Sequence, residues 1–213
     1  MTVSAAIGLL DAAGLRARLR DADLVAPARD PLGEGRGDGA DAVGTRLAAV
    51  LVPFVLGPAP SVLLTKRAAH LSAHAGQVSF PGGGIEPRDA SPEAAALREA
   101  EEEIGLDPRR VELLGRLVDH FTGTGYRITP VVGLLTPGLS LDALGLRPSD
   151  DEVEAIFELP LAVLLDRAAP QRRQATIGGR ARSFWVWPHP EHQIWGATAA
   201  ILVTLAARLR GDN

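Results

Sequence analysis

The stretch Phe80–Leu106, FPGGGIEPRDASPEAAALREAEEEIGL, decides the fold of this chain. It opens with a proline and three consecutive glycines, and it continues into an unbroken run of helix-forming residues that stops at Gly105. Ser91 is a good N-cap, the proline after it suits the first helical turn, and Gly105 suits the left-handed residue that ends a helix. The sequence therefore predicts a helix over Pro92–Ile104, one loop after a glycine-rich turn.

This predicted helix is more acidic than its own stability favours. Glu99, Glu102 and Glu103 are three and four residues apart, so they can share a face, and like charges at these spacings destabilise a helix. The last two also lie in the final turn, where the helix dipole disfavours carboxylates. A solvated acidic face is the plain alternative. A positive partner would explain the arrangement, because hard divalent cations such as Mg²⁺ take carboxylate ligands together with substrate phosphates.

The residues Arg98–Leu106, REAEEEIGL, resemble the signature helix of the Nudix hydrolases: Arg-Glu, an apolar residue, any residue, Glu-Glu, any residue, Gly and an apolar residue. The spacing from the glycines is one residue longer than in the general pattern, and Ala90 stands where that pattern has a glutamate. This departure resembles the coenzyme A pyrophosphatase branch. Its members carry Leu-Leu-Thr-x-Arg, a following Gly and Phe-Pro-Gly-Gly ahead of an equally lengthened box. Here these are Leu63–Arg67, Gly76 and Phe80–Gly83.

The resemblance implies a fold, a reaction and a cofactor. The fold class is α/β, a Nudix-type α/β/α sandwich around a mixed β-sheet, with an N-terminal helical extension. The reaction is metal-dependent hydrolysis of the diphosphate of coenzyme A or its derivatives to 3′,5′-ADP and (acyl-)4′-phosphopantetheine, with Mg²⁺ or Mn²⁺ as the cofactor. The alternatives are hydrolysis of another nucleoside diphosphate derivative, such as ADP-ribose or NADH, and a non-catalytic nucleotide sensor.

The acidic face carries the residues expected to do this chemistry. Cleaving a diphosphate requires neutralised phosphate oxygens, an aligned water and a group that takes its proton. Glu99 and Glu103 are the expected metal ligands, and Glu102 shares the cluster as a ligand and catalytic residue. Arg98 can reach Glu102 at the next turn and keep its carboxylate aimed. In some relatives a carboxylate in a later loop is the base, so Glu152 is a second catalytic candidate, with a solvated turn acid as the alternative.

The substrate-binding candidates come from other segments. Lys66 and Arg67 carry the cations that match phosphate oxygens. Backbone around Gly82 and Gly83 would hold the start of the helix against the site. Tyr126 follows a Gly/Thr turn, and its position is equally compatible with a place at the border of the substrate pocket and with simple packing.

Length and composition set the broad class. The 213 residues suit one domain with extensions. There is no cysteine, which excludes disulfides, thiolate catalysis and Cys-ligated zinc. The net charge of −4 gives no support to nucleic-acid binding, and we find neither a membrane-spanning run nor a signal peptide. We therefore expect a cytoplasmic enzyme for a small molecule, without nucleic-acid or membrane partners.

The N-terminal part is expected to precede the main domain as a helix and a linker. Apolar residues at helical spacing predict a helix over about 4–20, which would serve in packing or in contact with a second copy in a homodimer. Residues 26–44 are rich in Gly, Pro and Asp and predict a linker. The expected division is therefore an N-terminal helix and flexible linker over 1–44, and a Nudix hydrolase domain over 45–213 that includes the C-terminal helix.

Apolar runs between Gly and Pro predict the remaining elements of the main domain. They are strands over 45–56, 61–67, 111–121, 126–135 and 155–159, a short helix to about 166, a hairpin over 174–187 and a final helix over 192–210. In the second strand, Val62 and Leu64 should face one way and Leu63 the other. Pro130 indicates an edge position or a bulge, because it lacks the N–H that a central strand donates.

Overall fold

The computed structural model describes residues 11–19, 45–57, 59–72, 74–135, 141–177 and 180–212. The elements are, in chain order, α2 (Ala12–Leu19), β1 (Arg46–Val55), β2 (Ser61–Arg67), β3 (Val78–Ser79), β4 (Gly82–Gly84), α3 (Pro92–Ile104), the 3-10 helix η1 (Pro108–Arg110), β5 (Val111–Arg116), β6 (His120–Phe121), β7 (Tyr126–Leu135), α4 (Leu141–Leu144), β8 (Val153–Pro160), α5 (Leu161–Leu165), β9 (Gln171–Ile177), β10 (Arg180–Trp187), β11 (Ile194–Trp195) and α6 (Gly196–Arg210).

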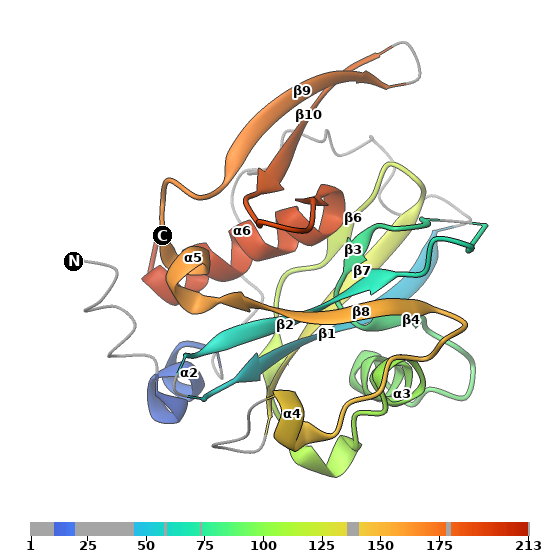
Figure 1. Ribbon diagram of the computed structural model, residues 1–213, viewed down its shortest axis with the longest axis vertical. Helices are drawn as coiled ribbons and strands as arrows, with labels where there is room; N and C mark the ends of the chain where they lie inside the picture. The colour runs from blue at the N-terminus through green and yellow to red at the C-terminus, as the bar shows by residue number, and fades with distance from the viewer. Residues whose placement is uncertain are drawn as a thin grey trace.

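A mixed β-sheet forms the centre of the molecule (Figure 1). Its path runs β3-β2-β1-β7-β5, while β4 pairs with β1, β6 with β7 and β8 with β2. The two long strands β1 and β7 pair in parallel over nine positions, and the other pairs of this sheet are antiparallel. A small second sheet has the order β11-β10-β9. The expected α/β class with a mixed sheet is confirmed.

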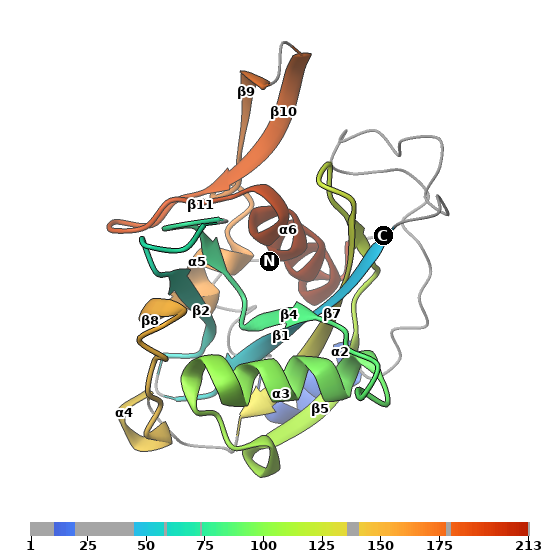
Figure 2. The ribbon, with the colours of Figure 1, turned by 90° about the vertical axis from the view of Figure 1, so that its right-hand side faces the viewer.

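The sheet separates two hydrophobic clusters, one under each face. On one face, Val62 and Leu64 pack with residues of α2, α5 and α6. On the other face, Leu63 packs with the apolar side of α3. The predicted alternation along β2 is therefore confirmed, and helices cover both faces of the sheet (Figure 2). Among the helices of the described part, none combines the length and the apolar character that crossing a membrane requires.

The single strand predicted over 111–121 is wrong, because the structure divides it into β5 and β6. Pro130 lies in the central strand β7, opposite this interruption, and the N–H of Leu117 donates to its carbonyl at 2.9 Å. The edge position expected for Pro130 is therefore also wrong. The bulge-like irregularity nearby is in β5, where the pairing with β7 shifts register between Leu113 and Gly115. The interruption lets β7 accept a proline in the middle of the sheet, since no ladder partner there needs its missing N–H.

The predicted final helix begins too early in the sequence. The helix α6 starts at Gly196, whereas Ile194 and Trp195 form β11, pairing with Trp187 and Val186 of β10. The predicted hairpin is confirmed as β9–β10, which projects from the body in both views (Figures 1 and 2). Its two turn residues, 178–179, lie outside the described part.

The N-terminal prediction can be followed over residues 11–19 alone; the predicted linker over 26–44 and the rest of the predicted helix lie outside the described part. Leu15 and Leu19 of α2 are fully buried in the cluster that holds α6. The backbone carbonyl of Leu19 lies so close to Gly115 of β5 that a Cβ there would come within 2.8 Å of it. This helix therefore packs tightly on the main domain.

Candidate active site

Local sequence signals build α3 as predicted, from Pro92 to Ile104. The hydroxyl of Ser91 accepts from the N–H of Ala94 at 3.2 Å, and Gly105 ends the helix in the left-handed conformation with φ 66°. Ala95, Ala96, Ala100 and Ile104 face the sheet and are fully buried. Three of these four side chains are alanines, so the helix packs close to the sheet. Its acidic side therefore lies against the neighbouring strand β4.

The glycines of β4 contact the acidic side of α3 directly. Gly82 pairs with Val50 in β1, and its N–H donates to Glu103 Oε2 at 3.1 Å. A Cβ on Gly83 would lie 2.5 Å from Glu99 Oε1. A side chain at this position would therefore push the Glu99 carboxylate out of its place, whereas the backbone conformation itself does not demand glycine. This backbone was expected to hold the start of the helix, which is wrong: Gly82 and Gly83 contact Glu103 and Glu99, in the second half of α3.

Glu103 is a buried carboxylate with two partners. Its side chain is 3% exposed; besides the N–H of Gly82, it contacts Arg67 NH1 at 3.3 Å. Burial raises the pKa of Glu103 to about 7, against the lowering effects of the Gly82 hydrogen bond and the Arg67 charge. Burial also raises the pKa of Glu99, with a smaller contribution from the charge of Glu152. Negative charge is therefore under-compensated here, which is typical of a site that binds a cation.

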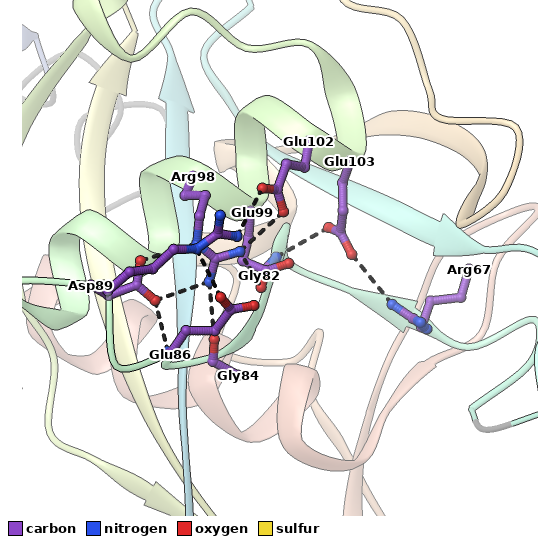
Figure 3. A network of polar contacts seen from close by, with 10 residues as sticks. Arg67, Gly82, Gly84, Glu86, Asp89, Arg98, Glu99, Glu102 and Glu103 are labelled. Carbon is purple, nitrogen blue, oxygen red and sulfur yellow. Dashed lines mark hydrogen bonds and ion pairs between the residues drawn. The ribbon is translucent and has the colours of Figure 1, made fainter.

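Arg98 binds the other two carboxylates of the cluster, and further hydrogen bonds fix the orientation of its guanidinium (Figure 3). Its NH1 donates to Glu99 Oε1 at 2.9 Å and to Glu102 Oε2 at 3.0 Å. Its Nε and NH2 each donate at 3.0 Å to Asp89, and NH2 also donates to the carbonyl of Gly84 at 3.1 Å. The expected reach from Arg98 to Glu102 is confirmed, and the guanidinium has little freedom to turn.

Asp89 is the residue of this site that sequence reasoning missed. Its side chain is 4% exposed, and besides Arg98 it accepts from the N–H of Glu86 at 2.8 Å, which closes the loop ahead of α3. The Arg98 hydrogen bonds lower the pKa of Asp89 to about 2, and in turn raise the pKa of Arg98. The available signal was Ala90, which stands where the general pattern has an acid, with an aspartate one residue before it.

Of the other predicted residues, Lys66, Tyr126 and Glu152 have no described hydrogen bond or ion pair with the three carboxylates, although the charge of Glu152 contributes to the raised pKa of Glu99 and of Glu103. Lys66 contacts Glu154 Oε1 at 2.6 Å, and only its neighbour Arg67 reaches the acidic cluster. The guanidinium of Arg46 lies 3.9 Å from the ring centroid of Tyr126, at the start of β1 and β7, so one face of this ring is covered. Glu152 is exposed in the loop before β8, where its carbonyl accepts from the N–H of Ala68.

The chain is similar in sequence to known proteins. Residues 45–177 match the family model of the NUDIX domain. The uncharacterized Nudix hydrolase NudL of Escherichia coli K12 is 44% identical over 164 residues, which are 77% of this chain and 83% of NudL. Among solved structures, the Nudix hydrolase RenU of M. smegmatis aligns with a TM-score of 0.43 and 23% identity, over 55% of this chain and 71% of RenU. The NUDIX domain of Shewanella oneidensis NrtR, solved with ADP ribose, aligns with a TM-score of 0.43 and 23% identity, over 56% of this chain and 75% of that one.

The family model and the similarity to NudL show that this chain belongs to the Nudix family. Nudix hydrolases act on pyrophosphate bonds and generally use divalent metal ions such as Mg²⁺ or Mn²⁺. The donors on α3 fit such an ion in chemistry, since all are carboxylate oxygens and one, on Glu103, is nearly fully buried. In the described residues no three acidic or histidine side chains converge as a ready-made metal cluster. Three guanidinium groups, those of Arg67, Arg88 and Arg98, lie against the three carboxylates instead.

Proposed function

We propose that this chain hydrolyses the diphosphate of coenzyme A or its acyl derivatives, releasing 3′,5′-ADP and (acyl-)4′-phosphopantetheine, with Mg²⁺ or Mn²⁺. One observation carries the choice of substrate. The two segments that resemble the coenzyme A branch, Leu63–Arg67 and Phe80–Gly83, both reach the same side chain of α3. Arg67 contacts one oxygen of Glu103, and the N–H of Gly82 contacts the other. Both segments that resemble the branch thus contact the most buried of the three glutamates.

Each residue of the site has a proposed task. Glu99, Glu102 and Glu103 would hold the divalent ion, which when bound supplies charge neutralisation on the phosphate oxygens and orients the attacking water. Arg98 would keep the carboxylates of Glu99 and Glu102 aimed, since it bridges both. Glu152 and Glu102 are the candidates for taking the proton of the water.

Binding of a diphosphate requires positively charged side chains that can contact its oxygens. Arg67 is 23% exposed and lies beside Glu103, so its guanidinium is within reach of a phosphate bound there. Lys66 and Tyr126 are the further substrate-binding candidates. Lys66 would have to leave Glu154, and Tyr126 would act together with Arg46, which covers its ring. The substrate is a small molecule in this proposal.

Product analysis tests this proposal. The protein is incubated with Mg²⁺ and separately with coenzyme A, acetyl-coenzyme A, ADP-ribose and NADH, and the nucleotides are separated by ion-exchange chromatography and identified by mass. We expect 3′,5′-ADP from coenzyme A or its acetyl form at the highest rate. AMP from ADP-ribose or NADH as the dominant product would overturn the choice of substrate. The Glu103→Gln protein, purified in parallel, shows whether a contaminating hydrolase produces the signal.

A further inference from the structure

Each of the three clustered carboxylates of α3 is bound to a guanidinium nitrogen in this structure. Arg98 Nη1 bridges Glu99 and Glu102, and Arg88 Nη2 lies 3.5 Å from Glu102 as well, whereas Arg67 Nη1 contacts Glu103 alone. A divalent ion that binds these carboxylates would therefore lie a few ångströms from a guanidinium group. Each carboxylate keeps further lone pairs, so the conflict between the two kinds of cation is charge repulsion, which is strong where water is largely excluded.

Arg67 and Arg98 are not held equally. Besides its contacts to the clustered glutamates, Arg98 donates three hydrogen bonds, two to Asp89 and one to the carbonyl of Gly84. Within the described ranges, the guanidinium of Arg67 has one hydrogen-bond partner, Glu103, at the long distance of 3.3 Å. Arg67 can therefore leave with a smaller loss than Arg98. Arg88 is exposed and touches only Glu102 within the cluster, so Arg67 is the arginine that decides whether Glu103 is free.

The departure of Arg67 would leave Glu103 poorly compensated. The side chain of Glu103 is 3% exposed, and its remaining contact is the N–H of Gly82 at 3.1 Å. A buried carboxylate without a cation is strongly disfavoured. Arg67 can therefore leave Glu103 at low cost only if another cation binds this carboxylate. A divalent ion bound there would in turn be repelled by the Arg67 guanidinium if it stayed a few ångströms away. Arg67 and a divalent ion are thus competitors for one carboxylate.

We propose that Arg67 is a positioning residue with two alternative partners. Without a divalent ion it neutralises Glu103, and when the ion takes Glu103 the guanidinium turns to the diphosphate of the substrate. The competition for Glu103 stands on the contacts of this structure. The second partner rests on the proposed function, because it requires a diphosphate to be bound beside the ion. No bond is made or broken in this exchange.

Manganese binding tests the competition without any substrate. Free Mn²⁺ is followed by its electron paramagnetic resonance signal in titrations of the wild type, Arg67→Gln and Lys66→Gln at pH 8.5. We expect Arg67→Gln to bind Mn²⁺ roughly tenfold more tightly than the wild type, because a competing and repelling cation is gone. Lys66→Gln removes the same charge from the neighbouring position, but its partner is Glu154, so its affinity should stay within about twofold of the wild type. Equal or weaker binding by Arg67→Gln would overturn the proposal.

Circular dichroism and thermal melting show whether each variant is folded. If Arg67→Gln does not fold, Arg67→Met takes its place, since methionine keeps a long flexible side chain without the charge. Arg67→Met should also bind Mn²⁺ more tightly than the wild type, and affinity equal to the wild type would contradict the competition.

Steady-state kinetics with coenzyme A test the second partner. At saturating Mn²⁺, Arg67→Gln should raise KM by about tenfold or more while kcat changes less, because a ground-state phosphate contact is lost. An unchanged KM would overturn this half of the proposal. The two proposals fail in different ways. Tighter Mn²⁺ binding by Arg67→Gln, together with no cleavage of coenzyme A by the wild type, would overturn the proposed function and leave the competition for Glu103 standing.

Discussion

Replacing Glu103 by glutamine should stabilise the metal-free protein at alkaline pH and leave its stability unchanged at acidic pH. Glutamine keeps the size of the side chain and an oxygen that can accept from the N–H of Gly82. It removes a charge that the folded protein holds nearly out of contact with water, at 3% exposure. The effect on the free energy of unfolding therefore depends on the protonation state of the original glutamate.

The pKa of Glu103 gives the size of this effect. It is about 7 in the folded protein, against the ordinary value of 4.5 that applies to the unfolded chain. The folded state thus binds the proton more tightly, and stability falls as pH rises from 4.5 to 7. Each pKa unit is worth about 1.4 kcal/mol, so the charged form destabilises the folded state by about 3 kcal/mol above pH 7. Glu103→Gln should increase the free energy of unfolding by up to this amount. The gain is reduced by the loss of the ion pair with Arg67, since a neutral amide replaces the carboxylate.

Urea unfolding followed by circular dichroism, in buffer with a chelator, measures the effect at pH 5 and pH 8. Glu101→Gln is the matched control. It lies two residues earlier on the same helix and is exposed, so its stability should change by less than about 0.5 kcal/mol at either pH. If Glu103→Gln is less stable than the wild type at pH 8, or differs from it equally at both pH values, the reasoning about the buried charge is wrong.

Three further predictions concern the residues around the carboxylates. Asp89→Asn should lower kcat by about 10- to 100-fold with a small change in KM, because Arg98 loses the partner that aims it; steady-state rates that match the wild type would contradict this. Gly83→Ala should fold but lose most of its activity, since the new Cβ displaces the movable carboxylate of Glu99, whereas Gly82→Ala should be destabilised by about 2 kcal/mol or more because its Cβ meets the backbone of β1. Thermal melting and activity assays on the pair should separate these effects, and equal behaviour of the two variants would count against the geometry. Millimolar Mn²⁺ should raise the melting temperature of the wild type by several degrees through binding to the folded form, and a scan without a shift would count against a metal site.

The parts of the fold that the sequence predicted correctly depend on local signals. The helix α3 has the bounds expected from its two caps, because Ser91 and Gly105 satisfy the helix ends within a few residues. Tertiary pairing decides the parts that were wrong. Residues Ile194 and Trp195 have a helix-compatible pattern, yet they pair with β10 and delay the start of α6 to Gly196. No local pattern states which distant strand will be available.

The candidate site divides in the same way. The contact between Arg98 and Glu102 follows from their four-residue spacing on one helix, so it could be predicted. The anchoring of Arg98 by Asp89 depends on the path of the loop before the helix, and the contact between Arg67 and Glu103 joins residues 36 positions apart. Side-chain orientation across elements is set by packing, and a sequence pattern contains no direct measure of it.

A crystal structure of the protein soaked with Mn²⁺, with the metal located by its anomalous scattering, tests the central claim most directly. We expect an anomalous peak beside the carboxylate oxygens of Glu99 and Glu103, with Arg67 turned away from Glu103. A structure without a peak at this face of α3, with Arg67 still on Glu103 at saturating Mn²⁺, would contradict it.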